Sequence, residues 1–100
     1  MSNQVIELND GNFSETVNSG VTLVDFWAPW CGPCLMQGPI VEQVAGELGS
    51  QAKVAKVNVD ESMRTAQQYR IQSIPTLLVL KDGKVKDQMI GVHSADQLTA

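Results

Sequence analysis

Apolar residues along the chain are spaced with two different periods. Some segments are continuously apolar or alternate every second residue, as strands do, and others repeat about every 3.6 residues, as helices do. Glycine, proline, asparagine and aspartate separate these segments. The predicted strands are residues 5–8, 21–28, 52–59, 76–80 and 85–91. With helices between the strands, the pattern predicts an α/β domain.

The longest predicted helix follows residues 29–33 and ends at Gly49. Pro39 lies inside it, lacks the N–H that a helix interior uses, and predicts a kink near Gly38. Apolar residues recur along this helix, so we expect them to form a stripe that faces a core. The main members of the stripe, spaced four residues apart, are Met36, Ile40, Val44 and Leu48, and they are joined by Val41 and Ala45.

Three shorter helices complete the pattern. The first presents Phe13 and Val17 one turn apart. The second is capped by Asp60 or Ser62 and runs through Tyr69, and the third runs from Ser94 to Ala100. The methionines that we interpret as packing residues are Met36, Met63 and Met89. The charged residues that we interpret as a solvated face are Asp60, Glu61, Arg64 and Arg70.

Composition narrows the class of protein. The 100 residues are 43% hydrophobic and 18% charged, as expected of one soluble domain spanning residues 1–100. A net charge of -4 with scattered lysine and arginine argues against nucleic acid as a partner. No apolar run approaches the roughly 20 residues of a membrane span, and no secretory signal pattern opens the chain. We expect a monomer in the cytoplasm, or in an organelle stroma or matrix.

The two cysteines, Cys31 and Cys34, lie where a buried strand gives way to the long helix. Unpaired backbone N–H groups and the helix dipole favour an anion there, which should lower the thiol pKa of an exposed Cys31. Cys31 would attack a target disulfide, and the less accessible Cys34 would resolve the mixed disulfide. Between them, Gly32 lets a substrate backbone approach closely and Pro33 preorganises the start of the helix.

Two other uses of the cysteines fit less well. A permanent stabilising disulfide across two intervening residues would restrict the unfolded chain little. A zinc site needs four ligands, and the single histidine, His93, is some sixty residues away. His93 as the base of a cysteine hydrolase would also lack an orienting acidic or amide partner.

Asp25 is the one charged residue in an otherwise apolar strand. An ionised carboxylate is costly to bury, so the pKa of Asp25 should rise. A carboxylate with a raised pKa suits a general base, and we expect it to take the proton of Cys34 directly or through a water molecule. The alternative is a carboxylate that anchors a neighbouring loop.

Residues 24–28 (VDFWA) and 30–34 (WCGPC) closely resemble the active-site segment of the thioredoxin family. The resemblance runs nearly end to end and includes Lys56, residues 73–76 (SIPT), the hairpin at 81–83 and Gly91. It implies the thioredoxin fold, an α/β architecture in which helices flank both faces of a central mixed β-sheet. Leu35 departs from the pattern, because many members carry a basic residue directly after the second cysteine.

The resemblance also implies roles for residues outside the cysteine motif. Lys56 would approach Asp25 from the adjacent strand and moderate its pKa, although a solvated strand lysine is nearly as consistent with the sequence. A cis peptide bond would precede Pro75, opposite the cysteines. Trp27 is interpreted as core packing.

A substrate segment would bind beside the cysteines if the resemblance holds. Ile74 and Pro75 would pair backbone groups with the extended segment, and Gly91 would leave room for it. Trp30, Ile74 and Val92 would supply an apolar rim. The alternative for Ile74 and Val92 is ordinary core or scattered surface packing.

The function implied by the resemblance is protein disulfide reduction with no bound cofactor. Electrons would come from NADPH through a thioredoxin reductase, or from ferredoxin, and would pass to targets such as ribonucleotide reductase or peroxiredoxins. The competing hypothesis is a non-catalytic, redox-sensitive interaction module, in which the apolar rim binds a partner and the thiols act only as a latch.

Overall fold

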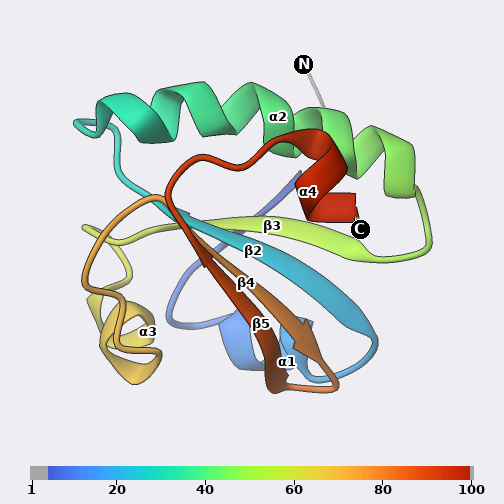
Figure 1. Ribbon diagram of the computed structural model, residues 1–100. Coiled ribbons are helices and arrows are strands. Elements are labelled where there is room, and N and C mark those ends of the chain that lie inside the picture. Colours follow the sequence, from blue (N-terminus) through green and yellow to red (C-terminus); the bar gives the residue numbers. More distant parts are fainter. Residues whose placement is uncertain (1–4, 100) are drawn as a thin grey trace.

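The computed structural model describes residues 5–99, in which strands and helices alternate (Figure 1). The strands are β1 (Val5–Leu8), β2 (Val21–Trp27), β3 (Lys53–Asn58), β4 (Thr76–Lys81) and β5 (Lys84–Ile90). The helices are α1 (Phe13–Val17), α2 (Gly32–Leu48), α3 (Met63–Gln68) and α4 (Ala95–Thr99). Each predicted element is present with bounds that differ by a residue or two, and the predicted end at Ala100 lies outside the described residues.

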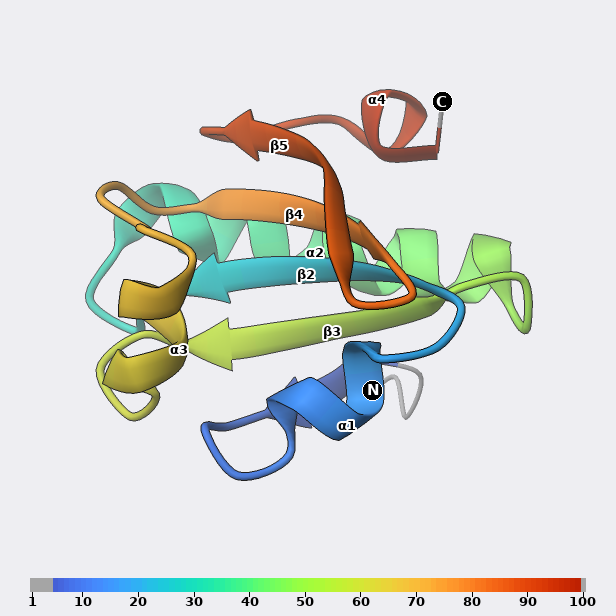
Figure 2. The ribbon, with the colours of Figure 1, turned by 90° about the horizontal axis from the view of Figure 1, so that it is seen from below.

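The five strands form one mixed sheet in the order β1-β3-β2-β4-β5. β3 runs parallel to both β1 and β2, whereas β4 is antiparallel to β2 and to β5. Helices α2 and α4 cover one face of the sheet, and α1 and α3 lie on the other (Figures 1 and 2). The predicted mixed sheet with helices on both faces is therefore confirmed.

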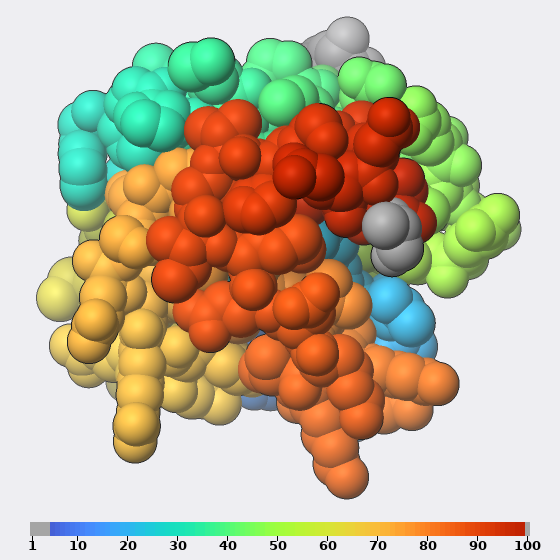
Figure 3. All heavy atoms as spheres, in the orientation of Figure 1, coloured from blue at the N-terminus to red at the C-terminus, as the bar shows by residue number. Residues whose placement is uncertain are grey.

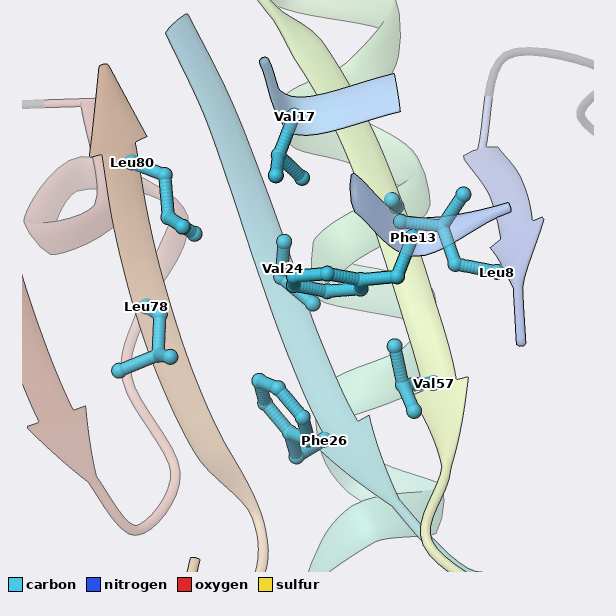
Figure 4. Packing of buried hydrophobic residues seen from close by; sticks show 9 residues of the cluster. Leu8, Phe13, Val17, Val24, Phe26, Val57, Leu78 and Leu80 are labelled. Atoms are coloured by element: carbon cyan, nitrogen blue, oxygen red, sulfur yellow. The ribbon is translucent and has the colours of Figure 1, made fainter. Parts of the chain in front are cut away.

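Side chains of β2 alternate between two hydrophobic cores. Val24 and Phe26 face α1, where Phe13 crosses over the sheet (Figure 4). The Phe13 and Tyr69 ring centroids lie 5.3 Å apart in this core. Leu23 points to the opposite face and packs with buried residues of α2 and α4. Asp25 shares that face with Leu23, because successive side chains of a strand alternate.

The apolar stripe of α2 is buried only in part, and its first member is on the surface. Met36 is 67% exposed, so its interpretation as a packing residue was wrong. Residues four apart rotate about 40° around a helix, so a stripe with that spacing drifts off the buried side. Val44 is fully buried and the predicted members Val41 and Ala45 are buried beside it, whereas Ile40 and Leu48 are half-buried.

The two other methionines behave differently from each other. Met63, in the first turn of α3, is also exposed, which contradicts its predicted packing role. Met89 of β5 is half-buried against the core under α2, so the prediction for it is confirmed. α2 continues through Pro39, and the kink near Gly38 stays a prediction. No helix in the described part of the chain is both long enough and apolar enough to span a bilayer.

The start of α3 is held by a residue that the sequence did not suggest. Ser62 occupies the N-cap position, but its side chain makes no capping hydrogen bond. The carboxylate of Asp10 instead accepts hydrogen bonds from the Thr65 backbone N–H at 2.8 Å and from its hydroxyl at 2.6 Å. These bonds hold the pKa of Asp10 below its ordinary value and fasten α3 to the segment that follows β1.

Candidate active site

The cysteine pair lies where β2 ends and α2 begins. Cys31 is the N-cap residue of α2, and Cys34 lies in the first turn. A disulfide joins them, with their Cα atoms 5.2 Å apart. The backbone N–H of Cys34 donates a hydrogen bond to the sulfur of Cys31 at 3.2 Å. In the reduced protein this N–H and the positive end of the helix dipole would stabilise a Cys31 thiolate.

The two sulfurs are unequal in access, though less so than the sequence suggested. Cys31 is 6% exposed and Cys34 is 2% exposed. The predicted order of access is confirmed, but the expectation that Cys31 is an exposed residue was wrong. The side chains around the pair belong to Ala28, Trp27, Val59 and Ile74.

The loop before β4 lies opposite the cysteines. The peptide bond between Ile74 and Pro75 is cis, as the resemblance implied. The carbonyl oxygen of Ile74 lies 3.7 Å from the sulfur of Cys31. The carbonyl of Pro75 accepts a 2.8 Å hydrogen bond from the N–H of Gly91. Gly91 has a φ of +90°, a conformation that other residues rarely adopt.

The three residues proposed as an apolar rim differ in exposure. Trp30 is 69% exposed, Val92 is exposed, and Ile74 is half-buried. The indole N–H of Trp30 donates a 2.7 Å hydrogen bond to the carboxylate of Asp60. Asp60 is exposed, as its interpretation as part of a solvated face requires, and its hydrogen bond to Trp30 is a contact at the surface. The two residues are 30 positions apart, so no local sequence pattern could reveal the pair.

Asp25 is buried beside the inner cysteine. It is 2% exposed, and its Oδ1 atom has no hydrogen-bond partner among residues 5–99. Burial raises the pKa of Asp25 to about 7, although the positive charge of Lys56 lowers it. Asp25 lines a cavity of about 170 Å³ together with Trp27, Cys34, Leu35, Gly38 and Lys56. That space is large enough for water between the carboxylate and the sulfur.

Lys56 stands next to Asp25 in the paired strands β2 and β3. Its ammonium lies 5.2 Å from the ring centroid of Trp27 and 3.6 Å from the carboxylate of Glu7. Glu7 is the register partner of Lys56 on β1, so the three charges lie in a row across adjacent strands. Trp27 is half-buried between the disulfide and this lysine, partly as expected of a packing residue.

Metal ligands do not gather anywhere in residues 5–99. In that range, no group of three or more histidine, cysteine or acidic side chains could hold an ion. The ring nitrogen Nδ1 of His93 lies 2.9 Å from the carbonyl oxygen of Gly91.

Comparison with known proteins gives this arrangement a family. A model of the thioredoxin family matches residues 4–100. The chain belongs to the thioredoxin family. It is 56% identical to "Thioredoxin 2" of Chlorobaculum tepidum over 93 residues, which cover 91% of this chain and 85% of that protein. It is 46% identical to the thioredoxin of Bacillus subtilis and 45% identical to that of Staphylococcus haemolyticus, in each case over 94% of this chain and 90% of the relative.

Membership in the thioredoxin family establishes the general activity. The chain is a thiol-disulfide oxidoreductase that reduces protein disulfides with the Cys31–Cys34 pair. Its partners are of two general kinds, proteins that contain a reducible disulfide and a reductase that restores the thiols.

Proposed function

We propose that Cys31 is the attacking thiolate, that Cys34 resolves the intermediate, and that Asp25 takes the proton from Cys34. The observation that carries this proposal is the shared cavity beside Asp25 and Cys34. Cys31 lies nearer the surface, and its sulfur accepts a hydrogen bond from the backbone N–H of Cys34. The two sulfurs therefore occupy different electrostatic environments.

The first step forms a mixed disulfide. The Cys31 thiolate attacks one sulfur of the target disulfide, and the target S–S bond breaks. The other target sulfur leaves as a thiolate and takes a proton from solvent. Helix α2 favours the attacking anion through its N-terminal dipole and the Cys34 N–H.

The second step releases the reduced target. The Asp25 carboxylate accepts the Cys34 thiol proton, directly or through water in the cavity, and the new thiolate attacks the sulfur of Cys31. A Cys31–Cys34 bond forms as the mixed disulfide breaks, and the second target sulfur leaves with the bonding electrons. Two electrons pass to the target, and the enzyme is oxidised to its disulfide.

The target segment binds across the cysteines. The backbones of Ile74 and Pro75 pair with it, as the position of the Ile74 carbonyl beside Cys31 supports. Gly32 and Gly91 leave room for its backbone, because neither has a Cβ and an added one would meet no atom within 4 Å. Pro33 presets the first turn of α2.

The exposed apolar side chains complete the binding surface. Trp30 and Val92 provide a rim on which apolar target side chains pack. Ile74 contributes from its half-buried position between the rim and the disulfide. Lys56 moderates the pKa of Asp25, which the direction of its effect on that pKa supports.

Family membership also supports a specific electron path. We expect the disulfide to be reduced by a thioredoxin reductase with electrons from NADPH, or by a ferredoxin-linked reductase. Targets would include ribonucleotide reductase or peroxiredoxins. The protein would act as a monomer in the cytoplasm, or in an organelle stroma or matrix, and would hold no cofactor.

Replacing the resolving cysteine tests the proposed roles. Cys34→Ser should trap targets as mixed disulfides through Cys31 and should lose turnover in an insulin-reduction assay. Cys31→Ser is the matched control, because it removes the attacking sulfur and should trap nothing. Equal trapping by both variants would contradict the assignment. If partner binding persists with both cysteines replaced and the parent shows no turnover, the interaction-module hypothesis is correct instead.

A further inference from the structure

Gln37 is a polar residue fully buried in helix α2, three residues after Cys34. Both ends of its side-chain amide are used. Its Nε2 donates a 3.0 Å hydrogen bond to the carbonyl oxygen of His93, and its Oε1 accepts a 2.8 Å hydrogen bond from the His93 N–H. A side-chain amide is costly to bury unless both its N–H and its oxygen are hydrogen-bonded. These two hydrogen bonds therefore allow a glutamine to be buried at this position.

His93, which Gln37 bonds, belongs to the segment that connects β5 to α4. This segment, residues 91–94, lies alongside α2 (Figures 1 and 3). It has no regular secondary structure, so its backbone groups must find partners elsewhere. Gln37 supplies partners for both backbone groups of His93.

The connecting segment is fixed on both sides of Val92. On one side, Gly91 donates to the carbonyl of Pro75 at 2.8 Å. On the other, His93 is held by Gln37. Val92 stands exposed between these two attachments. The first attachment ties the segment to the proline opposite the cysteines, and the second ties it to the helix that carries them.

We propose that Gln37 is a positioning residue for substrate binding, which holds the Val92 side of the groove at a fixed place relative to Cys31. This inference rests on the proposed binding surface. Gln37 is buried and does not touch the target. It acts through the backbone of His93. Residues 91–94 are therefore already ordered before the target binds, and binding does not have to supply the free energy of ordering them.

Gln37→Leu keeps the approximate size of the side chain and removes both hydrogen bonds. For a protein substrate such as insulin, KM should rise by up to about tenfold, because part of the free energy of the two lost hydrogen bonds must then be supplied when the target orders the segment. Both kcat for insulin and the reduction rate of a small aromatic disulfide should stay unchanged, because the cysteine environment is intact.

Two control variants separate positioning from general destabilisation. Gln43→Leu makes the same change at an exposed site of α2, where Gln43 bonds Glu47. Thr65→Val, in α3 on the face of the sheet opposite α2 (Figures 1 and 2), removes a buried hydroxyl hydrogen bond to Asp10. Neither should change KM for insulin. An equal rise in KM with Thr65→Val, or an unchanged KM with Gln37→Leu, would overturn the inference.

Backbone hydrogen exchange provides a second test that does not depend on the variants folding. In the wild-type protein the His93 amide should exchange slowly, because Gln37 accepts its hydrogen bond. Exchange as fast as in an unstructured peptide would also overturn the inference. Failure of the wild-type protein to reduce insulin would instead contradict the proposed function, so the two failures are distinguishable.

Discussion

Asp25 shows how one buried charge couples stability to chemistry. Burial raises its pKa to about 7, above the value near 4 of an unfolded aspartate. Below pH 4 the carboxyl is protonated in both states and costs nothing. Between about pH 4 and pH 7 the unfolded chain loses this proton while the buried carboxyl of the folded chain keeps it, and above pH 7 both states are ionised. Stability is therefore lost as pH rises.

Replacing Asp25 with asparagine should remove this loss. The pKa of Asp25 is about 7, against an ordinary value of 3.8. From this difference, Asp25→Asn should gain on the order of 4 kcal/mol in unfolding free energy above pH 7 and little near pH 4. Urea unfolding at pH 4 and pH 8 measures both values. The same gain at both pH values would show that the effect comes from packing and not from the carboxylate.

The same variant should slow the chemistry. Asparagine cannot accept the Cys34 proton, so resolution of the mixed disulfide should fall by about 10²-fold, the lower end for loss of a general base. Single-turnover release of a reduced target across pH 6 to 9 measures this rate, in a rough window around a free thiol pKa. Attack by Cys31 should change little, and wild-type resolution rates in the variant would refute the role of Asp25.

Lys56 should set the pH at which Asp25 works. Because its charge lowers the pKa of Asp25, Lys56→Met should raise that pKa above 7 and shift the rise of the resolution rate to higher pH. Lys84→Met, at an exposed position on β5, is the control and should leave the pH profile in place. Superimposed profiles for Lys56→Met and the wild type would contradict the prediction.

The sequence revealed some of these residues and not others. A single charge inside an apolar strand is a local signal, so Asp25 stood out, and the cysteine motif marked the site directly. Asp60 beside Trp30 and Gln37 beside His93 gave no such signal, because their partners lie 30 and 56 positions away. Their interactions depend on which segments the fold brings together.

At the scale of elements, periodicity predicted where helices form better than which side they bury. In α2 a spacing of four residues identified Val44 correctly and placed Met36 wrongly, since the buried side follows 3.6 residues per turn. A stripe defined by apolar character also passes over Gln37, which is fully buried on this helix. Burial there is decided by the position on the helix and the available hydrogen bonds.

Two alanine substitutions on α2 should distinguish its buried side from its exposed side by their effects on stability. Val44→Ala removes buried methyl groups at a packed position and should cost about 2 kcal/mol of unfolding free energy. Met36→Ala changes an exposed side chain and should stay within about 0.5 kcal/mol of the parent. Chemical denaturation of the three proteins provides the comparison. A loss at Met36 equal to that at Val44 would mean that the stripe is buried along its whole length.

At the scale of the molecule, the active site lies where the sheet, α2 and two loops meet. Residues from β2, α2, the segment before β4 and the segment after β5 form it. Periodicity alone could not predict which elements form the site, because it gives the strands in sequence order. In the sheet, β3 lies between β1 and β2. The resemblance to the thioredoxin family supplied the mixed sheet and the adjacency of the strands that carry Asp25 and Lys56, but the full strand order comes from the structure.

The fold itself should not depend on the disulfide that performs the reaction. Two hydrophobic cores, one on each face of the sheet, hold the elements together, and the bridged cysteines are only three positions apart. So short a loop restricts the unfolded chain little, and reduction should lower the unfolding free energy by at most about 2 kcal/mol. Urea unfolding with and without a reductant measures the difference, and far-ultraviolet circular dichroism should stay unchanged. A reduced protein that unfolds would contradict this prediction, because an oxidoreductase must remain folded in both redox states to complete its cycle.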